Sequence, residues 1–141
     1  MNLQFRAFAH RDLKEIVQVS LLGLEPVFIS FRKILGPAIY NFLYPDWREG
    51  QKEALEATCK DKEEVNVLVA ELGKNVVGFL AYELKSRIGE VLYWAVHPGH
   101  QNLGIGTALN SMALEKMQTA GMIMVEVGTG SDGVQLLPEG H

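Results

Sequence analysis

The sequence lacks several features that would place it in other classes of protein. Among its 141 residues there is one cysteine, Cys59, so an internal disulfide cannot form and we expect a reducing, cytoplasmic location. It has no run of about 18 apolar residues, the length that a membrane-spanning helix needs. Charges occur from the first residues onward, unlike the apolar core of a signal peptide. We therefore expect no membrane span and no secretory leader.

An excess of basic residues is also lacking. The chain has 13 Lys and Arg against 17 Asp and Glu, a net charge of -4, and no basic stripe that would neutralise a phosphate backbone. We therefore expect no nucleic-acid partner. The sequence contains neither an internal repeat nor a dividing linker, and 48% of it is hydrophobic. This composition suits one domain, which we expect over residues 1–130, followed by a short, ordered or disordered tail over residues 131–141.

The first half of the chain has strand and then helix periodicity. Residues 3–8 alternate apolar and polar side chains, which predicts a strand. Apolar residues then recur every three or four positions over 13–24, which predicts a buried helix face, and Asp12 followed by Glu15 resembles a capping box. Prolines are tolerated in a first helical turn, so Pro26, Pro37 and Pro45 each predict the start of a further helix.

The second half predicts a sheet with one more helix. Residues 65–72 and 76–84 form a predicted hairpin around a glycine-containing turn, and residues 89–96 predict a third strand. An amphipathic helix follows over residues 105–120, ends at Gly121, and leads into a strand over residues 122–127. The order of elements predicts an α/β domain of the α+β type, built on a mixed sheet.

A glycine-rich stretch, "HPGHQNLGIGTAL" over residues 97–109, lies where the third of these strands gives way to the long helix. A dinucleotide-binding fingerprint would need Gly or Ala at the position of Leu109. A P-loop would need lysine at the position of Ile105. Neither pattern is met.

A third pattern fits. Residues 101–106, "QNLGIG", match [Arg/Gln]-x-x-Gly-x-[Gly/Ala], which resembles the coenzyme A loop of the GNAT acyltransferase superfamily. The context is similar as well: an apolar strand ending in "VHP", the loop, a long amphipathic helix and a following strand. The resemblance covers residues 3–130 in element order and implies a GNAT-like acyl-CoA N-acyltransferase fold. Tight strand–helix turn geometry is the alternative explanation of the glycines.

The resemblance implies a binding site for acetyl-CoA as cosubstrate. Backbone N–H groups at a helix N-terminus suit a pyrophosphate, and glycine at 104 and 106 lets phosphate oxygens approach them. In this family the strand before the loop also pairs with the pantetheine arm, in the manner of an added strand. The cofactor-binding residues implied here are Trp94, Ala95, Val96, Gln101, Asn102, Leu103, Gly104, Ile105, Gly106 and Thr107.

Acyl transfer to an amine needs a base, because an ammonium group has no lone pair. Glu90 stands eleven residues before Gln101, the offset at which one branch of the family carries a glutamate base. A solvent-facing glutamate is the alternative interpretation. Glu126 is a second candidate base. His97 and His100 can titrate near neutral pH, but no acidic or cysteine ligand stands near to complete a metal site, so we expect no metal.

The sequence departs from the family after residue 127. GNAT domains usually continue with a tyrosine-bearing helix and two strands, whereas here residues 128–141 read "GTGSDGVQLLPEGH". We therefore expect a C-terminally shortened fold, and an uncovered edge strand with apolar residues in the tail predicts a homodimer.

Two functions remain open. One is an acetyl-CoA-dependent N-acetyltransferase acting on a small-molecule or peptide amine. The other is a non-catalytic acyl-CoA-binding or interaction module, favoured by the missing tyrosine.

Overall fold

A computed structural model describes residues 2–60, 65–127 and 134–136 of the chain. Its elements follow in the order β1 (Leu3–Ala7), α1 (Leu13–Leu35), α2 (Pro37–Leu43), α3 (Trp47–Lys60), β2 (Val65–Leu72), β3 (Asn75–Lys85), β4 (Ile88–Val96), α4 (Ile105–Thr119), β5 (Met124–Val127) and β6 (Val134–Leu136). Short 3-10 turns precede α1 at His10–Asp12 and follow β4 at Pro98–His100. No helix in this part of the chain is long and apolar enough to cross a membrane.

The strands form one six-stranded sheet in the order β1-β2-β3-β4-β5-β6. Every neighbouring pair is antiparallel except β4 and β5, which are parallel because α4 crosses over between them. The α/β fold on a mixed sheet that the sequence predicted is confirmed, and the bounds of the five predicted strands differ from the observed ones by at most two residues at either end. The third strand pairing, β3 with β4, has a register shift between Ala81 and Tyr82 that leaves Leu92 as an extra residue.

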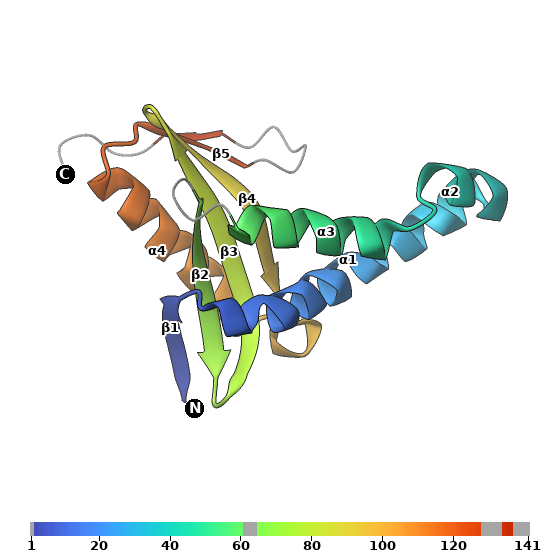
Figure 1. Cartoon of the computed structure of the whole chain (residues 1–141), viewed down its shortest axis with the longest axis horizontal. Coiled ribbons are helices and arrows are strands. Elements are labelled where there is room, and N and C mark those ends of the chain that lie inside the picture. The colour runs from blue at the N-terminus through green and yellow to red at the C-terminus, as the bar shows by residue number, and fades with distance from the viewer. Residues whose placement is uncertain (1, 61–64, 128–133, 137–141) are drawn as a thin grey trace.

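One face of the sheet is covered by α4 (Figure 1). The helix buries a regular stripe against it, spaced at three to four residues as the sequence indicated: Ile105, Leu109, Ala113 and Met117. These side chains join one core cluster with strand residues such as Leu80, Tyr82 and Val91. Gly89 of β4 lies directly beneath Met117, whose sulfur would be 2.6 Å from an added Cβ, so no larger residue fits there without a shift.

The opposite face is covered by α1 and α3 (Figure 1). Ile16 and Val19 of α1 and Leu55 and Cys59 of α3 pack on Phe79 and other strand residues to form a second core cluster. Burial raises the pKa of the Cys59 thiol, because the apolar surroundings disfavour the thiolate. The thiol is therefore a packing group.

The prediction that Pro26 starts a separate helix is wrong. Helix α1 runs without interruption from Leu13 to Leu35, with Pro26 inside it. An internal proline removes a backbone hydrogen bond, which disfavours a helix. Packing on both sides of the proline outweighs this cost: Ile16 lies in the core before it, and Phe28 stacks on Trp47 of α3 after it, with ring centroids 4.2 Å apart. The helices predicted at Pro37 and Pro45 are present, the second beginning at Trp47.

The predicted capping box at Asp12 and Glu15 is also wrong. The Asp12 side chain makes no cap hydrogen bond to α1. It accepts two hydrogen bonds from the Arg6 guanidinium, at 2.7 and 2.9 Å, and one from the Ala9 N–H at 2.8 Å. Glu15 instead accepts a hydrogen bond from the Val76 N–H at the start of β3. Both carboxylates therefore tie α1 to the sheet instead of closing its own first turn.

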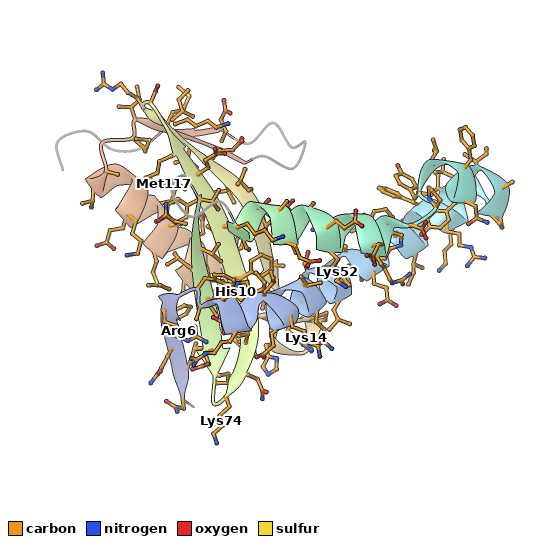
Figure 2. The ribbon with its side chains drawn as sticks, viewed as in Figure 1. Arg6, His10, Lys14, Lys52, Lys74 and Met117 are labelled. Carbon is orange, nitrogen blue, oxygen red and sulfur yellow. The ribbon has the colours of Figure 1, made fainter. Side chains whose placement is uncertain are left out.

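The buried Asp12 is held as a carboxylate. Its hydrogen bonds to Arg6 lower its pKa below the usual range, against the opposing effect of burial. Arg6 also donates to Glu71 at 2.9 Å across the β1–β2 pair, and these contacts raise the pKa of the guanidinium further. Figure 2 shows Arg6 on β1, next to the beginning of α1.

The strand β6 was not predicted from the sequence. Val134–Leu136 pair antiparallel with Met124–Glu126 of β5. Three residues inside the expected tail thus belong to the sheet, whereas residues 131–133 and 137–141 lie outside the described part of the chain.

Candidate active site

The site is built at the end of β4, beyond the residues that pair with β5. The parallel pairing of β4 with β5 covers Ile88–Val91 and Met124–Val127. Beyond it, Tyr93–Val96 pair with β3 on one side, and no described strand pairs with their other edge. The backbone of Trp94, Ala95 and Val96 therefore presents a strand edge of the kind that an extended ligand can pair with.

The chain is fixed where it leaves β4. The His97 N–H donates to the Val77 carbonyl at 2.7 Å, which continues the strand pairing by one step. The Nδ1 atom of His97 accepts a hydrogen bond from the Gly99 N–H at 3.0 Å, and the His100 N–H donates to the His97 carbonyl at 2.8 Å. These bonds fold residues 98–100 into a 3-10 turn and aim the following loop at α4.

The two glycines of the loop lie in different backbone conformations and different surroundings. Gly104 is the N-cap of α4 with φ of 79°, in the left-handed region that favours glycine, and an added Cβ there would meet nothing within 4 Å. Gly106 lies in the first turn of α4, where a Cβ would meet Val96 at 3.4 Å and Trp94 at 3.6 Å. Gly104 thus makes the turn beside open space, whereas a Cβ at position 106 would make only ordinary contacts with β4. The alternative explanation, turn geometry, accounts for part of the pattern.

The first turn of α4 has free donors. The Ala108 N–H donates to the Gly104 carbonyl at 2.9 Å, whereas the N–H groups of Ile105, Gly106 and Thr107 have no acceptor in the described part of the chain. Such donors, with the helix dipole behind them, form a site for an anion. The indole Nε1–H of Trp94 donates to the Gly106 carbonyl at 3.1 Å and ties this turn to β4.

A hollow of about 400 Å³ opens over these donors. The resemblance implied ten cofactor-binding residues, and nine of them line this hollow. Leu103 is the exception, and His100 lines the hollow although it was not among the ten. The lining residues are Trp94, Ala95, Val96, His100, Gln101, Asn102, Gly104, Ile105, Gly106 and Thr107. The structure therefore brings the strand edge and the loop together around one space.

A second hollow, of about 240 Å³, lies on the side of β4 that faces α1 and α3. It shares Trp94, Ala95, Val96 and Gln101 with the first, so the two hollows meet along the end of β4. Its other lining residues are Ser20, Gly23, Leu24, Gln51, Phe79 and Tyr93. Gln51 of α3 donates to the buried Ser20 hydroxyl of α1 at 2.9 Å, which joins the two helices above the hollow.

Sequence reasoning missed Ser20 and Gln51 as site residues. Ser20 was part of the predicted buried face of α1, and a polar residue on such a face was a usable signal. Gln51 offered none, because only the packing of α3 against α1 brings it over the hollow. Tyr93 of β4 also lines the second hollow.

Glu90 lines neither hollow. It is half-buried on β4 and stands directly opposite Glu83 of β3 and Glu126 of β5. Directly paired residues share a face of a sheet, so the three carboxylates form a row on the face covered by α1 and α3. Because of the extra residue Leu92, Tyr93 lies on this same face. The row settles the face of Glu126, which the sequence had left open.

The two histidines lie beside the loop, with ring centroids 5.3 Å apart. The Nδ1 atom of His97 is occupied by its hydrogen bond from Gly99, and the Nδ1 atom of His100 is buried without a hydrogen-bond partner. Among the described residues, no group of three or more His, Cys, Asp or Glu side chains could hold a metal ion.

Comparisons with known proteins agree with this geometry. A family model described as "Acetyltransferase (GNAT) family" matches residues 36–136. A search of curated proteins gives no match.

Solved structures share the fold. A PaiA N-acetyltransferase from Thermoplasma acidophilum in complex with coenzyme A is similar at a TM-score of 0.70 and 16% identity, over 90% of this chain and 79% of that one. A GNAT family acetyltransferase from Brucella melitensis in complex with acetyl-CoA is similar at a TM-score of 0.69 and 21% identity, over 99% of this chain and 90% of that one. The ribosomal-protein-S18-alanine N-acetyltransferase from Escherichia coli is similar at a TM-score of 0.66 and 11% identity, over 92% of this chain and 70% of that one.

The match of the family model covers most of the chain, and it includes the strand edge, the loop and the first turn of α4 that form the site. The chain belongs to the GNAT family of acetyltransferases.

Proposed function

We propose that this protein is an N-acetyltransferase that uses acetyl-CoA to acetylate an amine. One observation carries the proposal: the N–H groups at the start of α4 and the outer edge of β4 have no partner among the described residues, and both border the same hollow. An anionic group bound at the helix would leave an attached arm in line with the strand edge. Acetyl-CoA has these two parts, and when bound it supplies an acetyl group as a thioester.

The residues present fit coenzyme A. Its pyrophosphate would lie against the N–H groups of Ile105, Gly106 and Thr107, where Gly104 leaves open space. The side-chain amide of Gln101 would add a donor. The pantetheine amides would pair with the backbone of residues 94–96, whose outer edge has no described partner strand.

The second hollow is the proposed acceptor site. Its lining residues carry no formal charge, so it favours a neutral amine over an ammonium ion. Ser20, Gln51 and Tyr93 are positioned there to orient the amine by hydrogen bonds. The acceptor, a small molecule or a peptide, would then meet the acetyl group where the two hollows join, at the end of β4.

Glu90 is the proposed base, acting through water, because it lines neither hollow directly. It shares a sheet face with Tyr93 of the acceptor hollow, so water along this face could carry the proton from the amine to the carboxylate. Glu83 and Glu126 on either side strengthen the local negative potential, which would attract an ammonium acceptor towards this face before it gives up its proton to Glu90.

The single cysteine and the absence of a basic stripe support a cytoplasmic location and an acceptor other than nucleic acid.

Calorimetry with coenzyme A tests the proposed cosubstrate. The wild type should bind, and at a hundredfold excess over the dissociation constant its unfolding free energy should rise by about 2.7 kcal/mol. Gly104→Asp should abolish binding, because it places a negative charge beside the anion site. Gly50→Asp, on the exposed side of α3 with open space around it, is the matched control and should bind normally. No binding by the wild type at millimolar coenzyme A would refute the proposal.

The role of Glu90 needs an active amine acceptor, found by a turnover screen. Glu90→Gln should then lower the rate by about two to four orders of magnitude while acetyl-CoA affinity stays unchanged. Glu126→Gln is the comparison variant. If Glu126→Gln removes the activity and Glu90→Gln does not, the base is Glu126.

The position of Glu90 outside both hollows favours a second candidate, a module that binds acyl-CoA without transferring the acyl group. Tight coenzyme A binding with no turnover over a broad amine library would favour this candidate over the enzyme.

A further inference from the structure

Trp94 connects the two parts of the proposed cosubstrate site. Its backbone belongs to the section of β4 whose outer edge has no described partner strand. Its side chain reaches α4, where the indole Nε1–H donates to the Gly106 carbonyl at 3.1 Å. One residue therefore supplies backbone to the strand edge and a hydrogen bond to the first turn of the helix, where the anion site lies.

This hydrogen bond holds the first turn of α4 in a way that apolar packing does not. The buried stripe that begins at Ile105 holds the helix on the sheet, but apolar burial has no preferred direction. A hydrogen bond is directional, so the bond from Trp94 fixes the Gly106 peptide relative to β4. In the described part of the chain, no other side-chain hydrogen bond joins β4 to the loop or to the first turn of α4. The relative position of the strand edge and the helix start thus depends on the indole.

The indole also borders the space that a ligand would occupy. Trp94 pairs directly with Leu80, a member of the core cluster under α4, so the two side chains share that face of the sheet. Trp94 and Gly106 both line the hollow over the anion site, and Trp94 remains 44% exposed. A molecule in this hollow would therefore lie beside the ring.

We propose that Trp94 is a positioning residue, whose indole sets the separation between the anion site of α4 and the edge of β4. The inference rests on the proposed function, because coenzyme A carries a pyrophosphate and a pantetheine arm on one covalent chain. When both linked groups fit their subsites together, the second binds as an intramolecular step and the affinity rises well above that of either part. Subsites that shift relative to each other lose this gain, although each still binds its own fragment.

The affinities of the whole ligand and of its parts test this role. Trp94→Phe keeps an aromatic ring and removes the N–H donor. Its dissociation constant for coenzyme A should rise at least about tenfold, whereas those for pantetheine alone and for ADP, a pyrophosphate-bearing fragment, should change by less than about threefold. Calorimetry and competition at millimolar fragment concentrations measure all three.

The chain offers a matched control. It has two tryptophans, and the other, Trp47, stacks on Phe28 with ring centroids 4.2 Å apart and lines neither hollow. Trp47→Phe makes the same chemical change there and should leave all three affinities unchanged. In this variant Trp94 is the only tryptophan, so its fluorescence reports on the hollow. Coenzyme A should change that emission, with the dissociation constant that calorimetry gives.

The outcomes separate this inference from the proposed function. Equal losses of affinity for coenzyme A and for both fragments would overturn the positioning role, because the indole would then act by direct contact or through the stability of the whole site. A Trp94→Phe variant that binds coenzyme A as tightly as the wild type would overturn it as well. A wild type that binds none of the three ligands refutes the proposed cosubstrate, and the inference with it.

Discussion

The two faces of the sheet are covered in different ways. On one face, α4 buries a complete stripe from Ile105 to Met117, and every member of it is at most 2% exposed. On the other face, α1 is buried only in its first turns, leaves a hollow at Ser20 and Gly23, and then continues past the sheet edge. One helix is fixed along its whole length, and the other is fixed at one end.

The difference matches the work proposed for each side. The anion site depends on where the first turn of α4 lies, and a helix that buries one face along its whole length holds its N–H groups in place without a ligand. The acceptor side must admit and release a substrate, so a partly covered face suits it. The same partial cover leaves the outer half of α1 exposed beyond the sheet.

The largest contrast should appear when one side chain is removed from each of the two helices, α4 and α1, and the unfolding free energy of the protein is measured. Leu109→Ala removes a side chain that is fully buried under α4 and should lower the unfolding free energy by about 2 to 5 kcal/mol. Ile29→Ala removes a side chain from the outer half of α1 that is 49% exposed, and should change the unfolding free energy by less than about 0.5 kcal/mol. Urea denaturation of both variants measures this difference. Equal losses would show that the outer half of α1 carries as much of the fold as α4 does.

A second contrast lies at the buried start of α1. Asp12→Asn leaves the Arg6 guanidinium without its main partner and should cost about 2 to 3 kcal/mol of unfolding free energy. Glu71→Gln removes a more exposed partner of the same arginine and should cost less than about 1 kcal/mol. If the two variants are equally stable, then Asp12 does not anchor this end of the helix.

The pH dependence of the unfolding free energy follows from Asp12 as well. The folded-state pKa of Asp12 is lowered, so its contribution is fully present above the ordinary carboxylate pKa of about 4 and is lost as the pH falls through the folded-state value. Asp12→Asn should therefore lose less stability than the wild type between pH 4 and more acidic conditions. Thermal unfolding over this range measures the difference, and parallel curves for the two proteins would contradict the assignment.

The smallest contrast separates the two glycines of the loop. Gly104→Ala forces a side chain into φ of 79° and should cost about 1 kcal/mol of unfolding free energy. Gly106→Ala adds a Cβ in ordinary contact with Val96, within the first helical turn, and should shift stability by less than that. Melting of the ligand-free variants measures both. A larger loss for Gly106→Ala would mean that close packing on β4, and not backbone conformation, sets the loop.

Local patterns predicted much of the fold correctly. The alternation over the β2–β3 hairpin and the stripe along α4 were readable because each element buries one face at a fixed period. The prediction failed at Pro26 and at Asp12, where tertiary contacts outweighed a local signal: aromatic packing carried the helix past the proline, and Arg6 took the carboxylate that a cap would have used. Strand β6 was missed because three residues have too little periodicity to be recognised.

The sequence by itself determined the loop at residues 101–106, the helix that follows it and the family, because these depend on residues close together in the chain. The tertiary structure alone decided which groups share a space. It placed Ser20 and Gln51 over one hollow, set Glu83, Glu90 and Glu126 in a row, and carried the outer half of α1 beyond the sheet edge. The physical reason is that strand register and helix length relative to the sheet are set by packing between distant segments, and no local pattern encodes them.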